Sequence, residues 1–186
     1  MADTEALVFD DGEAVGVTVT GARQPGVQFA RTRLADVTLN RCDLSACDFS
    51  EAVWHRVALT GCRGSSIELA GAQLRHVTFI DCRIDEANFR LAQLRDVNFS
   101  ECGIAASLWN HARLEGVRFP DCDLRGADFS NARVEDTDLR RARLDGLQGV
   151  GSLRGATIGV DQLVTLAPAV AAALGLHVRP EDESGQ

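Results

Sequence analysis

The chain has 186 residues, 45% of them hydrophobic, and its 27 acidic against 19 basic side chains give a formal net charge of −8. This size and apolar content suit one domain with a continuous core. The acidic balance argues against a protein that binds nucleic acid through a basic face, so we expect no direct nucleic-acid binding.

The N-terminal segment, residues 1–13, carries five acidic and no basic side chains, so no secretory signal is expected. No apolar run approaches the length of a membrane span, so no membrane contact is expected. Without an export signal, the six Cys are expected to be free thiols in a reducing cytoplasm.

A period of five residues dominates the chain from Phe29 to Leu144. Every fifth residue in this range is apolar except Gly64, and all eight Phe and both Trp share the phase. A second track two residues earlier holds small or medium side chains, including all six Cys. Neither an α-helix nor an ordinary strand places residues five apart on one side, so the chain must turn inward every five residues.

A longer period of 20 residues runs through the same region, as four five-residue sides closing into a square coil require. Identical residues recur at this interval in columns such as Cys42, Cys62, Cys82, Cys102 and Cys122, or Val37, Val57, Val77, Val97 and Val117. The pattern predicts an all-β solenoid in which equivalent residues of successive coils stack on one another.

Several segments carry the resemblance to a known family: CDLSA (42–46), CDFSE (47–51), ANFRL (87–91), CDLRG (122–126) and ADFSN (127–131). They resemble the A(D/N)LXX consensus of the pentapeptide-repeat proteins. The resemblance covers residues 27–146, and Phe9 and Val19 extend its phase toward Leu7. It implies a right-handed quadrilateral β-helix of about seven coils, paired at about 4.8 Å spacing. Because the phase never slips, no large loops are expected.

The predicted organisation places the β-helix at residues 1–149, a linker at 150–160, a C-terminal helix at 161–176 and a polar tail at 177–186. Asp161 is expected to cap the helix, Gly175 to follow its end and Pro168 to kink or divide it. The apolar stripe of this helix is expected to close the last coil or to form a twofold dimer. The stripe consists of Leu163, Leu166, Val170 and Leu174. Resemblance to the gyrase-interacting mycobacterial type implies the dimer.

No constellation of catalytic residues is found in the sequence. The four His lie outside the two inward tracks, and no Ser-His-Asp order, phosphate loop or HExxH motif is present. The Cys column has apolar inward neighbours, which favours core packing over a metal site. We therefore expect no enzyme, no cofactor and no metal.

The outward positions give candidate binding residues instead. One acidic face is expected to carry Asp48, Glu51, Glu68 and Asp128, and a corner ridge to carry Asp81, Glu101 and Asp121 at 20-residue spacing. The face next to the acidic one carries six Arg against five acids. Evenly spaced carboxylates can imitate phosphates, and the alternative is a solvated ridge without a partner.

The family resemblance implies one concrete activity. Some members imitate the outline of B-form DNA, bind DNA gyrase or topoisomerase IV and protect it from quinolones or other gyrase poisons. The alternative is a protein-interaction scaffold of unknown partner. One local weakness is also expected at Gly64, where a large core residue is missing and Trp54 is the candidate to fill the space.

Overall fold

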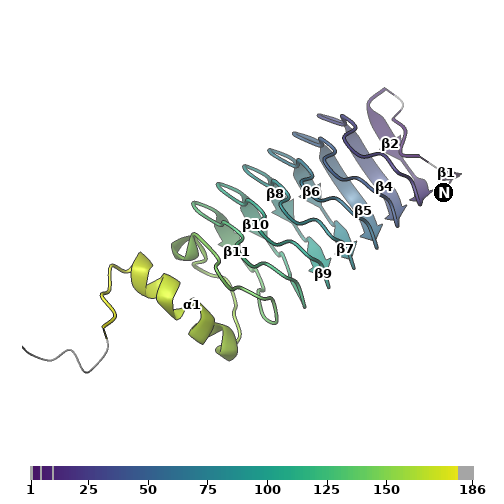
Figure 1. The fold of residues 1–186 in the computed structure, drawn as a ribbon. Helices are drawn as coiled ribbons and strands as arrows, with labels where there is room; N and C mark the ends of the chain where they lie inside the picture. Colours follow the sequence, from purple (N-terminus) through teal and green to yellow (C-terminus); the bar gives the residue numbers. More distant parts are fainter. Residues whose placement is uncertain (1, 5, 10, 180–186) are drawn as a thin grey trace, which may run out of the picture.

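The computed structural model describes residues 2–4, 6–9 and 11–179. The chain winds into a rod of parallel strands, from purple at its N-terminal end to green at the last coils, and helix α1 (Val160–Ala173) follows (Figure 1). The fold is the predicted right-handed four-sided β-helix with a C-terminal helix, in about 6 turns. This is fewer than the seven coils expected, because the coils at both ends are incomplete.

The strands occupy two of the four sides of the rod. They are β1 (Ala2–Thr4), β2 (Glu13–Val15), β3 (Val17–Thr20), β4 (Arg33–Asn40), β5 (Val53–Thr60), β6 (Gln73–Arg75), β7 (Thr78–Ile80), β8 (Gln93–Arg95), β9 (Asn98–Ser100), β10 (Arg113–Glu115) and β11 (Arg133–Glu135). The other two sides are held by single parallel pairs such as Asp43↔Arg63 and Asp48↔Glu68. We name the sides, in chain order, after one central inward residue of each: the Leu44 side, the Phe49 side, the Trp54 side and the Leu59 side.

Successive coils pair at an interval of 20 residues. Val53 pairs with Gln73, and Gln73 pairs with Gln93, all in parallel. The interval shortens only at the ends: β1 pairs with β3 at an interval of 15, Ala2 with Val17. The 20-residue register is therefore the rule that keeps each kind of side chain on its own side of the rod.

Each corner is made by a residue in the left-handed backbone region, two positions after the central residue of a side. Among the described residues, all 20 non-glycine residues with positive φ occupy this position, for example Glu51 (φ 59°), Leu91 (φ 60°) and Asp96 (φ 54°). Such a conformation is unfavourable for side chains with a Cβ. Coil-to-coil hydrogen bonds, such as Glu51 N to Ala70 O at 2.8 Å, hold it in place.

The interior consists of the two predicted inward tracks. Aromatic rings stack between coils, with centroids 4.6 Å apart for Phe79 and Phe99 and 4.1 Å apart for Phe89 and Trp109. Such aromatic contacts stabilise the core in addition to the stabilisation that comes from burying apolar surface. All six Cys are free and buried, which confirms the prediction that the Cys column packs in the core.

The space beside Gly64 is already filled. A Cβ added at Gly64 would lie 3.1 Å from Ile84 Cγ2 and 3.6 Å from Ile67 Cδ1. Neighbouring isoleucines, and not the indole of Trp54, therefore supply the atoms nearest to this position. The local weakness expected at Gly64 stays a prediction, and Ile84 and Ile67 lie beside the glycine where the larger side chain is missing.

Residues 150–158 continue the last coil and α1 begins at Val160, so the predicted linker is wrong. Thr157 N donates to Thr137 O at 2.9 Å, and Thr157 pairs with Asp138 at an interval of 19. The coil is thus one residue shorter than the others at this point, and the short 3-10 helix η1 (Val150–Ser152) lies in the shortened stretch. Leu153 and Ile158 pack against the core, so apolar burial continues up to the start of α1.

Helix α1 begins one residue earlier than predicted. Gly159, and not Asp161, is the N-cap, because the side chain of Gln162 accepts a hydrogen bond from Gly159 N at 2.6 Å. The same side chain donates to Leu139 O at 2.7 Å and thereby ties the helix to the last coil. Asp161 lies in the first turn, where a carboxylate is favourable.

The C-terminal half of α1 follows the prediction only in part. Pro168 lies inside one continuous helix, so it does not divide the helix, and the alternative, a kink at Pro168, stays a prediction. Gly175 has φ +69° just after the end of the helix, as predicted for that position. Of the predicted tail, residues 180–186 lie outside the described part of the chain. No helix among the described residues is long and apolar enough to cross a membrane.

Candidate functional site: the outer sides of the rod

Three carboxylates of the Phe49 side accept hydrogen bonds from their own coil or from the next one. Asp48 Oδ1 accepts a hydrogen bond from Ser50 N at 2.8 Å, and Glu68 accepts one from the amide of Asn88 at 2.7 Å. Asp128 accepts from Ser130 N at 2.8 Å. Burial opposes ionisation of Asp128, but hydrogen bonds outweigh it and hold its pKa below the usual value. These predicted site residues therefore have a structural use.

The fourth predicted residue of this set, Glu51, stands at the corner that follows the Phe49 side, with its side chain exposed. Its backbone N–H bonds to the next coil. The structure thus brings all four predicted carboxylates to one side and its adjoining corner. Glu51 is the one that is most open to a partner.

The predicted ridge is present at the corner after the Leu59 side. Asp81, Glu101 and Asp121 occupy successive coils with φ of 50°, 55° and 57°. Asp121 forms an ion pair with Arg141 at 2.6 Å. Within the described chain, no cation lies within ion-pair distance of Asp81 or Glu101. The ridge therefore has two uncompensated carboxylates, and the third, Asp121, is neutralised by an Arg of the next coil.

The Trp54 side combines basic and acidic residues. Arg56 bonds to Asp36 in the previous coil, with its Nη2 at 2.6 Å from Oδ2. Arg95 pairs with Glu115 of the next coil at 3.2 Å. These exposed pairs follow the 20-residue register. The side chains of both pairs are about half exposed, so each pair contributes little stability.

The Leu59 side contains a neutral surface that the sequence analysis missed. From β3 to β9 its ten outward residues carry no charge: Thr18, Thr20, Thr38, Asn40, Ala58, Thr60, Thr78, Ile80, Asn98 and Ser100. The positions on either side of each central residue show this pattern in the sequence once the sides are separated. Charge returns on this side at Arg118, so the neutral surface ends before the last coils.

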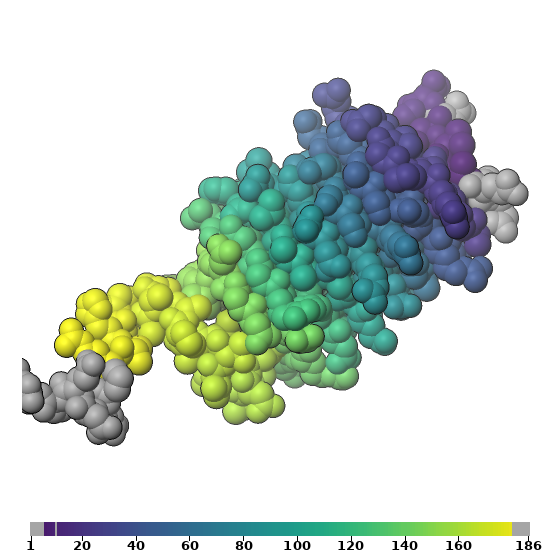
Figure 2. All heavy atoms as spheres, in the orientation of Figure 1, coloured from purple at the N-terminus to yellow at the C-terminus, as the bar shows by residue number. Residues whose placement is uncertain are grey.

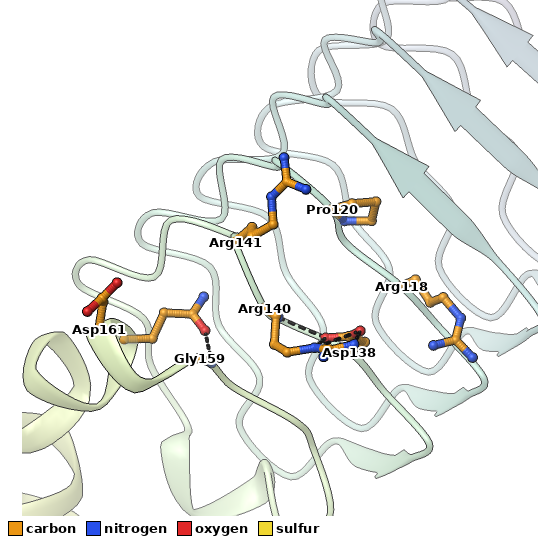
Figure 3. A pocket seen from close by; sticks show the side chains of 8 residues that line it. Arg118, Pro120, Asp138, Arg140, Arg141, Gly159 and Asp161 are labelled. Carbon is orange, nitrogen blue, oxygen red and sulfur yellow. Dashed lines mark hydrogen bonds and ion pairs between the residues drawn. The ribbon is translucent and has the colours of Figure 1, made fainter.

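One cavity of about 610 Å³ lies between the last coils and the start of α1 (Figure 3). Three Arg line it, and each is ion-paired. The pairs are Arg140 with Asp138 at 2.7 Å, Arg141 with Asp121 at 2.6 Å and Arg118 with Asp136 at 3.6 Å. The cavity wall is therefore electrically compensated. Among the described residues, no group of three or more His, Cys, Asp or Glu is arranged to hold a metal ion.

The apolar stripe of α1 is divided between the core and the surface. Leu166 is 3% exposed and Val170 packs against the core, so these two residues close the last coil. Leu163 and Leu174 are 56% and 69% exposed, and Val164, which the sequence analysis did not single out, is 78% exposed. Figure 2 shows the C-terminal segment (yellow) projecting beyond the last coils. The helix therefore offers an apolar surface without a partner in the described chain.

Comparison with known proteins identifies the repeats. Residues 18–89 and 78–148 match the family model described as a pentapeptide repeat region. No curated protein matches the chain significantly.

Similar solved structures share 19% identity with the chain. Full-length QnrB1, described as a plasmid-mediated fluoroquinolone resistance protein, matches with a TM-score of 0.47 over 87% of this chain and 92% of that chain. HetL from the cyanobacterium Nostoc, involved in heterocyst differentiation regulation, gives 0.44 over 72% and 62%. A pentapeptide repeat protein from the thylakoid lumen of Arabidopsis thaliana gives 0.46 over 77% and 82%. Because the two matches to the family model together cover residues 18–148, more than half of the chain, this chain belongs to the pentapeptide repeat family.

Proposed function

We propose that the chain is a non-catalytic protein-binding rod whose acidic ridge engages a type II topoisomerase, DNA gyrase or topoisomerase IV, on the surface that normally holds DNA. The observation that carries the proposal is the axial column formed by Asp81 and Glu101, which no cation among the described residues compensates, in a chain with a net charge of −8. The resemblance of the repeats to the gyrase-interacting type supplies the partner. Protection from quinolones or other gyrase poisons would follow from competition with DNA.

Spacing and charge support this choice. Carboxylates on successive coils stand about 4.8 Å apart along the rod axis, which is comparable with the roughly 3.4 Å of helix axis per phosphate of one DNA strand. A DNA-binding surface is basic and attracts such a column, and the attraction weakens as salt screens it. Solenoid proteins in general bind partners through their extended outer surfaces.

Dimerisation through α1 would lengthen the acidic surface that faces the partner. Leu163, Val164 and Leu174 form an exposed apolar surface next to the cap, and a patch of this kind is typical of an interface. A twofold axis through α1 would place two rods end to end and double the length of the acidic column. Such a dimer would suit a partner that is itself twofold symmetric.

The test is a supercoiling assay with purified gyrase, with and without a fluoroquinolone, in which this protein is titrated. The parent should inhibit supercoiling and lower drug-induced cleavage. The triple variant Asp81→Arg, Glu101→Arg and Asp121→Arg changes the charge by about six units and should lose most of the inhibition. A control with the same charge change, Glu86→Arg, Glu115→Arg and Glu135→Arg, alters other sides of the rod and should still inhibit.

The second candidate function is a scaffold or adaptor with another protein partner. It is favoured by the neutral outward residues of the Leu59 side and by the ion pairs of the Trp54 side, since DNA mimicry uses neither of them. If the parent leaves both supercoiling and drug-induced cleavage unchanged, the adaptor replaces the topoisomerase as the proposed function. Equal inhibition by the folded ridge variant and the parent would remove the ridge from the contact.

A further inference from the structure

A cationic notch lies near the N-terminal end of the rod, where the corner after the Leu59 side meets the Leu44 side. The notch has a volume of about 470 Å³ and is lined by Arg23, Arg41, Cys42, Asp43, Gly61 and Arg63. Arg23 pairs with Asp43 and Asp43 with Arg63 through the backbone of successive coils. Three Arg from three successive coils therefore line a notch that contains a single carboxylate.

The notch is open because the corner column has glycines on both sides of Arg41. Gly21 and Gly61 occupy the equivalent corners of the adjacent coils, with φ of 71° and 61°. A Cβ added at Gly61 would lie 3.5 Å from Arg41 Cγ. At the next corners of the column, Asp81 and Glu101 carry side chains. Because the adjacent corners have no side chains, the space beside Arg41 stays open and its guanidinium group stays exposed.

None of the three Arg of the notch has an ion-pair partner among the described residues. Within the described chain, no carboxylate oxygen lies within 4.0 Å of a guanidinium nitrogen of these residues. Asp43 instead accepts hydrogen bonds from Ser45, at 2.7 Å from its hydroxyl and 3.1 Å from its backbone N–H. The lining thus carries three positive charges against one negative charge, in a chain whose net charge is −8.

The same two columns look different at the other end of the rod. Arg141, in the corner column of Arg41, pairs with Asp121 at 2.6 Å. Arg143, in the column of Arg23 and Arg63, lies 3.8 Å from Asp123. At this end of the rod a carboxylate of the adjacent coil lies within 4.0 Å of each Arg. At the notch the corner residues on either side of Arg41 are glycines, and Asp43, which stands between Arg23 and Arg63, is hydrogen-bonded to Ser45. Among the described residues the three guanidinium groups therefore have no carboxylate within 4.0 Å and are free for an external anion.

We propose that this notch is a binding site for a compact polyanion, namely a small molecule that carries a phosphate or pyrophosphate group. Guanidinium groups donate paired hydrogen bonds to phosphate oxygens and are suited to this ligand. The volume is many times that of one water, about 30 Å³, so more than one phosphate group fits. An extended polyanion such as DNA is disfavoured, because the ridge beyond Gly61 is acidic.

The experiment is a calorimetric titration of the full chain with pyrophosphate at constant ionic strength. We expect saturable binding of one pyrophosphate per chain. Each charge-assisted contact is worth about a factor of ten or more, so Arg41→Gln with Arg63→Gln should weaken binding about 100-fold. The matched control, Arg141→Gln with Arg143→Gln, changes the same columns and should alter affinity less than about twofold.

Three outcomes would overturn the proposal. The first is the absence of saturable binding to the parent, and the second is equal weakening in the control and in the notch variant. The third is displacement of pyrophosphate by a short DNA duplex at a lower concentration, which would assign the notch to nucleic acid. All four substituted Arg are exposed, so thermal melting should show that both variants are folded.

Discussion

Trp109 Nε1 donates a hydrogen bond of 2.7 Å to Ser107 Oγ, which itself donates to Ile104 O at 2.7 Å. Both side chains are fully buried. The other tryptophan, Trp54, has no acceptor for its Nε1 within the described chain. Ala52 holds the position before Trp54 that Ser107 holds before Trp109, so the two indoles differ by one hydroxyl group.

Ser107→Ala is expected to lower the free energy of unfolding by about 1–3 kcal/mol, because it leaves a buried indole N–H without an acceptor. Ala52→Ser should have the opposite sign, a gain of about 1 kcal/mol. Thr32, in the same column as Ala52, shows that a hydroxyl fits there, since its Oγ1 donates to Phe29 O. Urea unfolding followed by Trp fluorescence measures both, and a neutral Ser107→Ala would contradict the assignment.

Gly64→Leu is expected to destabilise the coil by about 1–3 kcal/mol, because the new side chain must displace Ile84 and Ile67. Gly64→Ala brings only a Cβ to within 3.1 Å of Ile84 Cγ2 and should cost less than about 1 kcal/mol. Chemical denaturation of both variants gives the comparison. A Gly64→Leu protein more stable than the parent would show that the site is empty after all.

Leu91→Asn should raise the free energy of unfolding by up to about 1 kcal/mol. Leu91 holds a corner with φ 60° and is 65% exposed, and Asn tolerates this backbone region better than Leu. The matched change is Gly126→Ala, at a corner with φ +68° and nothing within 4 Å of an added Cβ. It should cost about 1 kcal/mol from backbone strain alone. Thermal melting tests the pair, and a stabilising Gly126→Ala would refute the strain argument.

Alkaline pH should destabilise the fold through its thiols. The pKa of Cys102 is raised to about 12, mainly by the neighbouring Cys122 thiol and to a smaller extent by burial. The pKa of Cys82 is raised to about 12 in the same way, by the Cys102 thiol and by burial. An unfolded thiol titrates near pH 8.5. The folded state therefore holds these protons more tightly, and this stability is complete below about pH 8.5 and is lost as pH rises toward 12.

The chain contains no Tyr and no Lys, so these thiols dominate the alkaline range. Each raised thiol removes about 1.4 kcal/mol per pH unit above its unfolded pKa, and we expect a total loss above about 2 kcal/mol by pH 11. Cys122, whose pKa the Cys102 thiol lowers, opposes part of the effect. The double variant Cys82→Ala with Cys102→Ala should show a flatter alkaline limb. An unchanged slope would reject the thiols as its cause.

Leu163→Asp with Val164→Asp should give monomers in sedimentation if α1 forms the proposed dimer, with little change in melting temperature, because both side chains are exposed. Leu166→Asp is the contrasting variant. It places a carboxylate at a site that is 3% exposed and should detach the cap at a cost of several kcal/mol. A parent protein that sediments as a monomer would remove the dimer from the proposal.

Periodicity predicted the coils and their core, because inward residues must recur wherever the chain closes a turn. It also placed Asp81, Glu101 and Asp121 in one column. The ion pair between Asp121 and Arg141 could have been predicted in the same way, because the two residues are 20 positions apart. The N-cap could not be predicted locally, because Gln162 is positioned by a carbonyl of the previous coil.

The corners could not be predicted from residue type either. Residues as different as Arg56 and Ala106 share the left-handed conformation there. It is imposed by hydrogen bonds to the adjacent coils and not by the preference of each residue. The neutral outward residues of the Leu59 side are a different case, because they become apparent in the sequence as soon as outward positions are sorted by side.

The register of 20 residues also makes the length of this protein adjustable in fixed steps. Deleting residues 81–100 would join Ile80 to Glu101 in phase, shorten the rod by about 4.8 Å and keep every column continuous. Deleting only five residues would rotate everything beyond the cut by one side. Helix α1 would then sit a quarter turn away from its present position. Evolution by duplication or loss of whole coils can therefore change the reach of the rod without redesigning its core or its cap.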